Sequence, residues 1–253
     1  MSLPSAGSRS GLRYAEVVDR LRPAGKSSAT APLYSRWVNR PLGRRLAAVA
    51  HLAGRTPDQV TAVSGLVTFS GIVLVALCRP SVVVGIAVTF LLVLGYALDS
   101  ADGQLARLRG GGSLTGEWLD HMVDCAKNAS VHLALLISLY RFGDTPPALF
   151  LLPAAFQLVV TVMFFGTVLT DKLRLAGTTG GPAGPGRHPL ARSVLVAPAD
   201  YGLLCVAFVL FGARPAFLTV YAVLFLGSAA YLAVGLVRWH HQVAAADAAR
   251  QLD

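Results

Sequence analysis

The sequence predicts an all-α, polytopic membrane protein with six transmembrane helices. Of its 253 residues, 54% are hydrophobic and only 14% are charged, whereas a soluble domain carries about 25% charged residues. The apolar residues gather in six stretches near the length of about 20 residues that a helix needs to cross a bilayer. The net charge of +9 is typical of cytoplasmic loops that face anionic lipid, so we do not expect nucleic acid as a partner.

The segment before the first span has two parts. Residues 1–32 are basic and rich in Ser, Gly, Ala and Pro, without the apolar run of a signal peptide, so we expect a disordered cytoplasmic tail. Residues 33–54 place Arg36, Arg40 and Arg44 on one face of a helix, while Trp37 can lie on another. This pattern favours an amphipathic helix in the membrane interface. An ordinary basic helix is the alternative.

Turn and capping residues separate the spans. Residues 56–59 (TPDQ) combine a helix cap, a proline at the first helical position and a capping box. The sequences RP at 79–80, GGGS at 110–113 and DTPP at 144–147 are typical of turns. The expected spans are about 59–78, 81–108, 116–141, 147–171, 193–212 and 215–237.

Basic residues divide unequally between the two sides that six spans define. Eighteen of the 22 Lys and Arg residues fall on the side that holds both termini, and three fall on the other. Because positively charged loops stay in the cytoplasm, we expect a multi-pass protein of the cell membrane with both termini cytoplasmic. Its membrane domain would cover residues 33–240, followed by a C-terminal cytoplasmic tail over residues 241–253.

Four carboxylates interrupt the apolar pattern: Asp99, Asp102, Asp120 and Asp124. Each carboxylate near the middle of a membrane helix costs about 2.5–3.5 kcal/mol on insertion scales, and a bound cation would offset that cost. The first two are three residues apart and the last two are four apart, so each pair shares a helix face. Two helices joined by the glycine-rich turn could therefore enclose one or two hard cations, which prefer oxygen ligands.

The same segment matches a longer pattern. It reads DSADGQLAR over residues 99–107, then eight residues, then GEWLDHMVD over residues 116–124. This resembles the CDP-alcohol phosphotransferase signature DxxDGxxAR-x8-GxxxDxxxD at all eight fixed positions. The resemblance implies that a substituted phosphate passes from a CDP-alcohol, with CDP-diacylglycerol as the implied donor, to an acceptor alcohol with release of CMP, as in phospholipid biosynthesis. It also implies two Mg²⁺ or Mn²⁺ ions at the four aspartates, with Asp124 as the base.

The resemblance further implies a nucleotide site. Its expected residues are Gly103, Ala106, Arg107, Gly116, Asp58 and Thr61. The small residues would let a cytidine ring or a diphosphate approach the backbone closely, and the arginine would contact phosphate. Helix packing is the alternative role of small residues in membrane helices. The last two residues resemble a family segment near the nucleotide, and capping of the first span explains them equally well.

Polar residues at the cytoplasmic ends of the fourth and fifth spans are the candidates for acceptor binding. They are Lys172, Arg174, Arg187, His188, Arg192 and Asp200. A phosphorylated acceptor such as glycerol 3-phosphate or inositol phosphate would need a basic pocket of this kind. The basic character of cytoplasmic loops is the alternative explanation. The signature does not distinguish among acceptor alcohols, and the sequence neither supports nor excludes the homodimer that is common in the family.

Two other classes of protein, a transporter and a noncatalytic scaffold, are alternatives to the transferase. An ion- or proton-coupled transporter also places carboxylates in the membrane, but such proteins often show repeats and broken helices in both halves. This sequence has no second acidic cluster and no repeat. A noncatalytic scaffold would not need a complete acidic set. The expected partners are therefore a CDP-alcohol, a small alcohol acceptor and the lipid bilayer.

Overall fold

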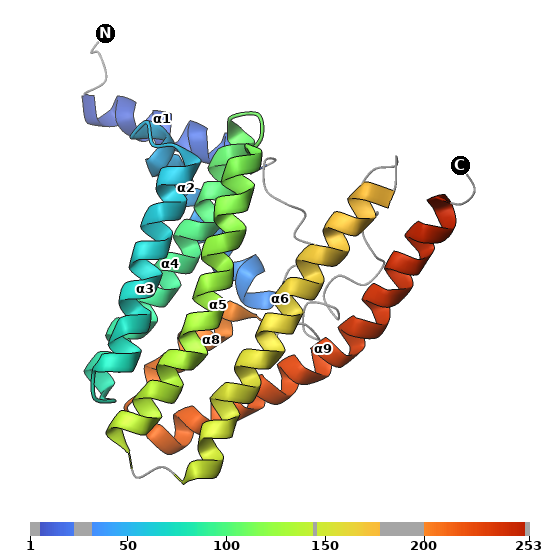
Figure 1. Cartoon of the computed structure of the whole chain (residues 1–253). Coiled ribbons are helices and arrows are strands. Elements are labelled where there is room, and N and C mark those ends of the chain that lie inside the picture. Colours follow the sequence, from blue (N-terminus) through green and yellow to red (C-terminus); the bar gives the residue numbers. More distant parts are fainter. Residues whose placement is uncertain (1–5, 23–31, 144–145, 178–199, 251–253) are drawn as a thin grey trace.

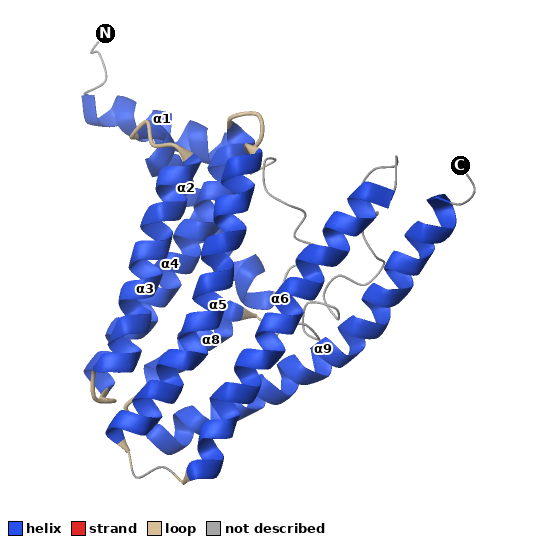
Figure 2. Cartoon of the chain, viewed as in Figure 1, coloured by secondary structure: helices blue, strands red, loops and turns tan. Residues whose placement is uncertain are grey.

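The computed structural model describes residues 6–22, 32–143, 146–177 and 200–250, and these ranges contain helices and no strand (Figure 2). The elements are α1 (Ala6–Leu21), the π-helical turn η2 (Ser35–Asn39), α2 (Arg40–Leu52), α3 (Pro57–Leu77), α4 (Val82–Leu108), α5 (Leu114–Phe142), η3 (Pro147–Phe150), α6 (Leu151–Gly177), α8 (Tyr201–Ala207), η5 (Phe208–Leu210) and α9 (Arg214–Arg250). Figure 1 shows α3, α4 and α5 side by side, with α6 and α9 leaning away from them.

Five helical segments of the described chain are long and apolar enough to cross a membrane. They are Pro57–Leu77, Val82–Leu108, Leu114–Phe142, Pro147–Arg174 and Arg214–Ala248. These segments correspond to the predicted spans one to four and six. At the predicted fifth span the described apolar helix covers only Tyr201–Leu210. It begins there because Asp200 caps α8 by accepting a hydrogen bond from the Gly202 N–H at 3.0 Å.

The prediction of a disordered tail over residues 1–32 is wrong for Ala6–Leu21, which forms α1. Val17 and Leu21 are buried and pack in one cluster with Ala48 of α2 and Leu105 of α4. The Ser- and Gly-rich composition hid this apolar stripe, whose members recur at helical spacing. The helix expected over residues 33–54 is present as η2 and α2, and α9 remains helical into the expected C-terminal tail.

The termini of α3 and α5 are set by their caps. Thr56 and Gln59 form the predicted capping box, with the Gln59 N–H donating to Thr56 Oγ1 at 3.2 Å. Ser113 accepts a hydrogen bond from the Gly116 N–H at 2.9 Å and starts α5. Between α4 and α5, Gly110 and Gly111 have φ values of 97° and 127°, which glycine adopts without strain. This tight turn places the end of α4 beside the start of α5.

Small and hydroxyl-bearing residues bring α3 and α4 close together. A Cβ built on Gly95 would clash with the Thr68 side chain, so the close approach of the two helices requires a glycine there. Ser64 adds a hydrogen bond from its hydroxyl to the Gly95 carbonyl at 2.9 Å. This contact, together with the turn before α5, fixes α3 beside α4 and α5, the two helices that carry the four aspartates.

Candidate active site

Three of the four aspartates meet where α4 and α5 face each other. Asp99 comes from α4, and Asp120 and Asp124 come from α5. One carboxylate oxygen from each lies within 4.8 Å of the other two. Metal–oxygen distances of about 2.0–2.6 Å would let a single ion contact oxygens at this separation, and an all-oxygen set suits Mg²⁺, Mn²⁺ or Ca²⁺. The donor set and its spacing therefore fit a hard divalent cation.

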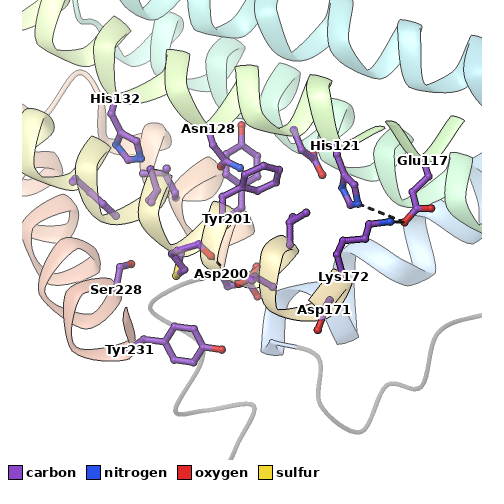
Figure 3. Close-up of a pocket in the computed structure, with 18 residues that line it drawn as sticks. Glu117, His121, Asn128, His132, Asp171, Lys172, Asp200, Tyr201, Ser228 and Tyr231 are labelled. Carbon is purple, nitrogen blue, oxygen red and sulfur yellow. Dashed lines mark hydrogen bonds and ion pairs between the residues drawn. The ribbon is translucent and has the colours of Figure 1, made fainter. Parts of the chain in front are cut away.

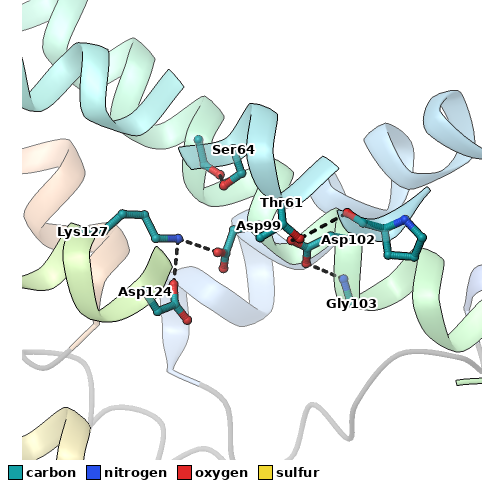
Figure 4. A network of polar contacts seen from close by, with 9 residues as sticks. Thr61, Ser64, Asp99, Asp102, Gly103, Asp124 and Lys127 are labelled. Carbon is teal, nitrogen blue, oxygen red and sulfur yellow. Dashed lines mark hydrogen bonds and ion pairs between the residues drawn. The ribbon is translucent and has the colours of Figure 1, made fainter. Parts of the chain in front are cut away.

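Asp102 is held apart from this trio by its own hydrogen bonds. Its Oδ2 accepts from the Thr61 hydroxyl at 2.6 Å, and its Oδ1 accepts from the Gly103 N–H at 2.5 Å (Figure 4). Thr56 is the cap of α3, and the Thr61 side chain instead links α3 to the acidic group on α4. Both oxygens of Asp102 keep further lone pairs that could contact a cation.

Lys127 is a member of the site that the sequence reasoning missed. Its ammonium lies 2.5 Å from Asp99 Oδ1 and 2.7 Å from Asp124 Oδ1, and its side chain is 4% exposed (Figure 4). The signal was present, because a lysine inside an apolar span, three residues after Asp124, must share the acidic face of α5. One ammonium offsets part of the charge of four carboxylates, so the cluster retains negative charge for a cation.

All six residues expected around the nucleotide line one cavity of about 500 Å³: Asp58, Thr61, Gly103, Ala106, Arg107 and Gly116. Two of the acidic residues, Asp102 and Asp120, border the same space. A Cβ on Gly116 would lie 2.9 Å from Asp58 Oδ1, so the approach of α5 to the start of α3 depends on a glycine there. The volume is within the range of small-molecule sites.

A second cavity of about 580 Å³ opens between α5, α6, α8 and α9, with Asp124 in its lining (Figure 3). Of the residues expected to bind the acceptor, Lys172 and Asp200 line it. Both have protein partners. The Lys172 ammonium donates to Glu117 Oε1 at 2.7 Å, and Asp200 accepts from the Gly202 and Ser35 N–H groups at 3.0 and 3.2 Å.

Only one of the other expected acceptor residues lies in the part of the chain that the structure describes. Arg174 is half-buried on α6 and does not border the second cavity. Arg187, His188 and Arg192 lie outside the described residues. In the described lining, Lys172 stands against the carboxylates of Glu117, Asp124, Asp171 and Asp200. The described acidic and lysine residues of this cavity are thus four carboxylates and one lysine, and the basic acceptor pocket, three of whose residues lie outside the described chain, stays a prediction.

A third cavity, of about 620 Å³, lies on the η2 and α2 side of the four aspartates, all of which border it. The arginines expected on one face of an interfacial helix, Arg36, Arg40 and Arg44, also line this space. Their four-residue spacing was visible in the sequence. Their position beside the acidic cluster was not, because it depends on how α2 packs on α4.

Comparison with known proteins gives a family and a fold. A sequence model of the family described as CDP-alcohol phosphatidyltransferase matches residues 55–239. Two crystal structures of Mycobacterium tuberculosis phosphatidylinositol phosphate synthase (PgsA1) are similar. The one with CDP-DAG bound is 21% identical with a TM-score of 0.51, covering 81% of this chain and 93% of that chain. The one in complex with manganese and citrate is 20% identical with a TM-score of 0.53, covering 81% and 88%. A search of curated proteins gave no match.

Proposed function

Because the chain belongs to the CDP-alcohol phosphatidyltransferase family, we propose that it transfers a substituted phosphate from a CDP-alcohol to an acceptor alcohol and releases CMP, in phospholipid biosynthesis. One observation carries the proposal: the six nucleotide-site residues share a single cavity with Asp102 and Asp120, directly beside the acidic trio. The donor we propose is CDP-diacylglycerol, which a protein of similar fold has bound. The proposed acceptor is a polyol phosphate, such as glycerol 3-phosphate or inositol phosphate.

The charge of the donor explains the composition of the site. A diphosphate would lie near Arg107, which can donate to its oxygens, and near the small residues Gly103 and Gly116. Two Mg²⁺ or Mn²⁺ ions held by the four aspartates would stabilise the negative charge that builds up during transfer. The manganese complex of a protein with a similar fold supports this choice of metal.

Asp124 is the proposed base, because it borders both the second and the third cavity as well as the acidic trio. Its side chain is 30% exposed, compared with 16% for Asp99. The acceptor hydroxyl would give its proton to Asp124 while its oxygen bonds to the β-phosphorus. The bond from that phosphorus to the bridging oxygen breaks, and CMP leaves with this oxygen.

The distribution of charged and exposed apolar residues suggests how the chain lies in the membrane. We propose six spans, with the fifth ending in α8 and η5, and with both termini and the site on the cytoplasmic side. The unequal division of Lys and Arg supports this orientation. Trp37, Val49 and Leu52 of η2 and α2 are exposed, which supports a position for these helices in the membrane interface.

The test is metal-dependent CMP release by the purified full chain in detergent micelles that contain CDP-diacylglycerol. With Mg²⁺ or Mn²⁺ and a panel of alcohols, we expect CMP to appear together with a labelled lipid product. EDTA should abolish both signals, and added metal should restore them. Absence of CMP with every acceptor and both metals would overturn the proposal, and metal-coupled ion flux in liposomes would support the transporter instead.

A further inference from the structure

The third cavity contains polar atoms that no residue of the described chain satisfies. Arg36 Nη1, Arg44 Nε and Asn39 Oδ1 are buried and have no hydrogen-bond partner, and all three residues line the cavity. Asn39 is 3% exposed. A buried polar atom left without a partner costs about 1–3 kcal/mol, and more when the group is charged. Two guanidinium groups and one amide therefore belong to the lining of this cavity, and each has a polar atom that the described protein leaves without a partner.

The neighbouring aspartates do not account for these donors. Lys127 contacts Asp99 and Asp124, and no described carboxylate forms an ion pair with Arg36 or Arg44. The Arg36 guanidinium lies 5.3 Å from the centre of the Trp37 ring, a contact that orients the group without using its N–H donors. An oxyanion is the natural partner for such donors.

Close packing of α2 on α4 holds the arginines in place. A Cβ on Gly43 would lie 2.7 Å from Ser100 Oγ. The Gln104 amide N–H group donates to the Arg40 carbonyl and to Ser100 Oγ, each at 3.2 Å. Because these contacts fix the α2 backbone against the helix that carries Asp99, the cavity is preorganised and does not need to form when a ligand arrives.

We propose that this cavity binds the phosphate of the acceptor. Arg36 and Arg44 would donate to the phosphate oxygens, and Asn39 would accept a hydrogen bond from one hydroxyl group of the acceptor alcohol. The inference rests on the proposed function, since it locates the acceptor of that reaction. Asp124 borders the same cavity, so an acceptor anchored by the arginines has its remaining hydroxyls on the side of the base. Four carboxylates border each of the two cavities, but five arginines line the third and a single lysine lines the described part of the second, so the third cavity fits a phosphate better.

Kinetics with radiolabelled acceptors test the proposal. We expect the wild-type chain, with CDP-diacylglycerol and Mg²⁺, to use sn-glycerol 3-phosphate or myo-inositol 1-phosphate and not glycerol or myo-inositol. The double variant Arg36→Gln/Arg44→Gln should raise KM for the phosphorylated acceptor at least about 10-fold while KM for CDP-diacylglycerol stays within about twofold, since a lost charge-assisted hydrogen bond costs about 1.5–3 kcal/mol. Arg45→Gln is the matched control, because Arg45 is exposed and does not line the cavity.

Three results would overturn the site. The first is an unchanged KM for the phosphorylated acceptor in the double variant. The second is a rise confined to KM for CDP-diacylglycerol, which would assign the arginines to a lipid phosphate. The third is the use of unphosphorylated alcohols alone by the wild-type chain. If the double variant does not fold, Arg36→Lys keeps the charge and should raise the acceptor KM less than Arg36→Gln does. Thermal stabilisation by the two phosphorylated alcohols, lost in the arginine variants, tests the site even if no CMP is released, so failure of the proposed function is distinguishable.

Discussion

Two groups of helices in this molecule are held together by different interactions. In the first, formed by α3, α4 and α5, buried charged and polar groups contact each other across the helices, as in the links from Lys127 to Asp99 and from Thr61 to Asp102. In the second, formed by α6, α8 and α9 with η5, aromatic rings pack on one another. Phe208 and Phe217 have ring centroids 5.1 Å apart, and Phe217 and Tyr221 have centroids 5.8 Å apart.

The two kinds of interaction differ in how precisely they fix the positions of atoms. A charge-assisted hydrogen bond fixes individual atoms, whereas apolar packing depends mainly on volume and tolerates rearrangement. A reaction at phosphorus needs carboxylate oxygens in fixed positions, so we place the chemistry in the first group of helices. The second group of helices lines one side of its own cavity, which shares Asp124 with the acidic trio and shares Glu117 and His121 with the cavity proposed for the nucleotide.

The strongest test of this division is Asp124→Asn. The amide can neither accept the hydroxyl proton nor supply a carboxylate to a metal, so kcat for CMP release should fall about 10³-fold or more. Circular dichroism and thermal unfolding should show that the protein remains folded. Asp247→Asn, an exposed change on α9, is the control and should retain full turnover. Turnover at the wild-type rate by Asp124→Asn would place the chemistry elsewhere.

A second test removes the cation from the first group. Lys127→Met leaves Asp99 and Asp124 facing each other without the ammonium, and losing one partner of a buried ion pair costs about 3–5 kcal/mol. Thermal unfolding without metal should therefore begin at a lower temperature than in the wild type. Mn²⁺ should stabilise the variant more than the wild type, because a divalent ion can take over the neutralising role.

Lys172→Met is the matched change in the second group. Lys172 pairs with Glu117, but its side chain is 51% exposed, and exposed pairs contribute about 0–1 kcal/mol. The unfolding temperature of the Lys172→Met variant and its response to Mn²⁺ should stay close to those of the wild type. Equal losses of stability in the two lysine variants would remove the distinction between the two groups.

Local sequence signals predicted the first group well. The cap at Thr56, the turn at residues 110–113 and the spacing of the aspartates each act over a few residues, so α3, α4 and α5 followed directly. The fold of α1 was missed because its stability comes from burying Val17 and Leu21 against α2 and α4, a contact that composition does not reveal. The start of α8 was missed because a single cap, Asp200, decides it.

The site divides in the same way. The cavity proposed for the nucleotide was expected from the family resemblance, because the signature residues lie on both sides of one turn and Asp58 and Thr61 lie at the start of the first span. The arginine cavity was not, since it forms only when α2 packs against α4 some 60 residues further along the chain, as in the Gln104–Arg40 hydrogen bond. The carboxylates in the described lining of the second cavity also come together through long-range packing, which brings Asp124, Asp171 and Asp200 from three segments of the chain to one cavity.

A smaller effect on catalysis than that of Asp124→Asn is expected from a single methyl group in the cavity proposed for the nucleotide. In Gly116→Ala the new Cβ would lie 2.9 Å from Asp58 Oδ1, so α5 must shift or the Asp58 side chain must turn into the cavity. KM for CDP-diacylglycerol should rise about 10-fold, equivalent to about 1.4 kcal/mol, with a smaller change in KM for the acceptor. The initial-rate kinetics that separate the two KM values measure this directly.

The matched substitution, Gly235→Ala, places its methyl group in the second group of helices, 3.4 Å from the Trp239 ring, which is an ordinary contact distance. We expect it to leave both KM values unchanged, because aromatic packing on α9 can absorb a methyl group. If Gly116→Ala were equally silent, the close approach of α5 to α3 would not define the nucleotide cavity. If Gly235→Ala raised either KM, the aromatic group would take part in binding and would be more than a supporting wall.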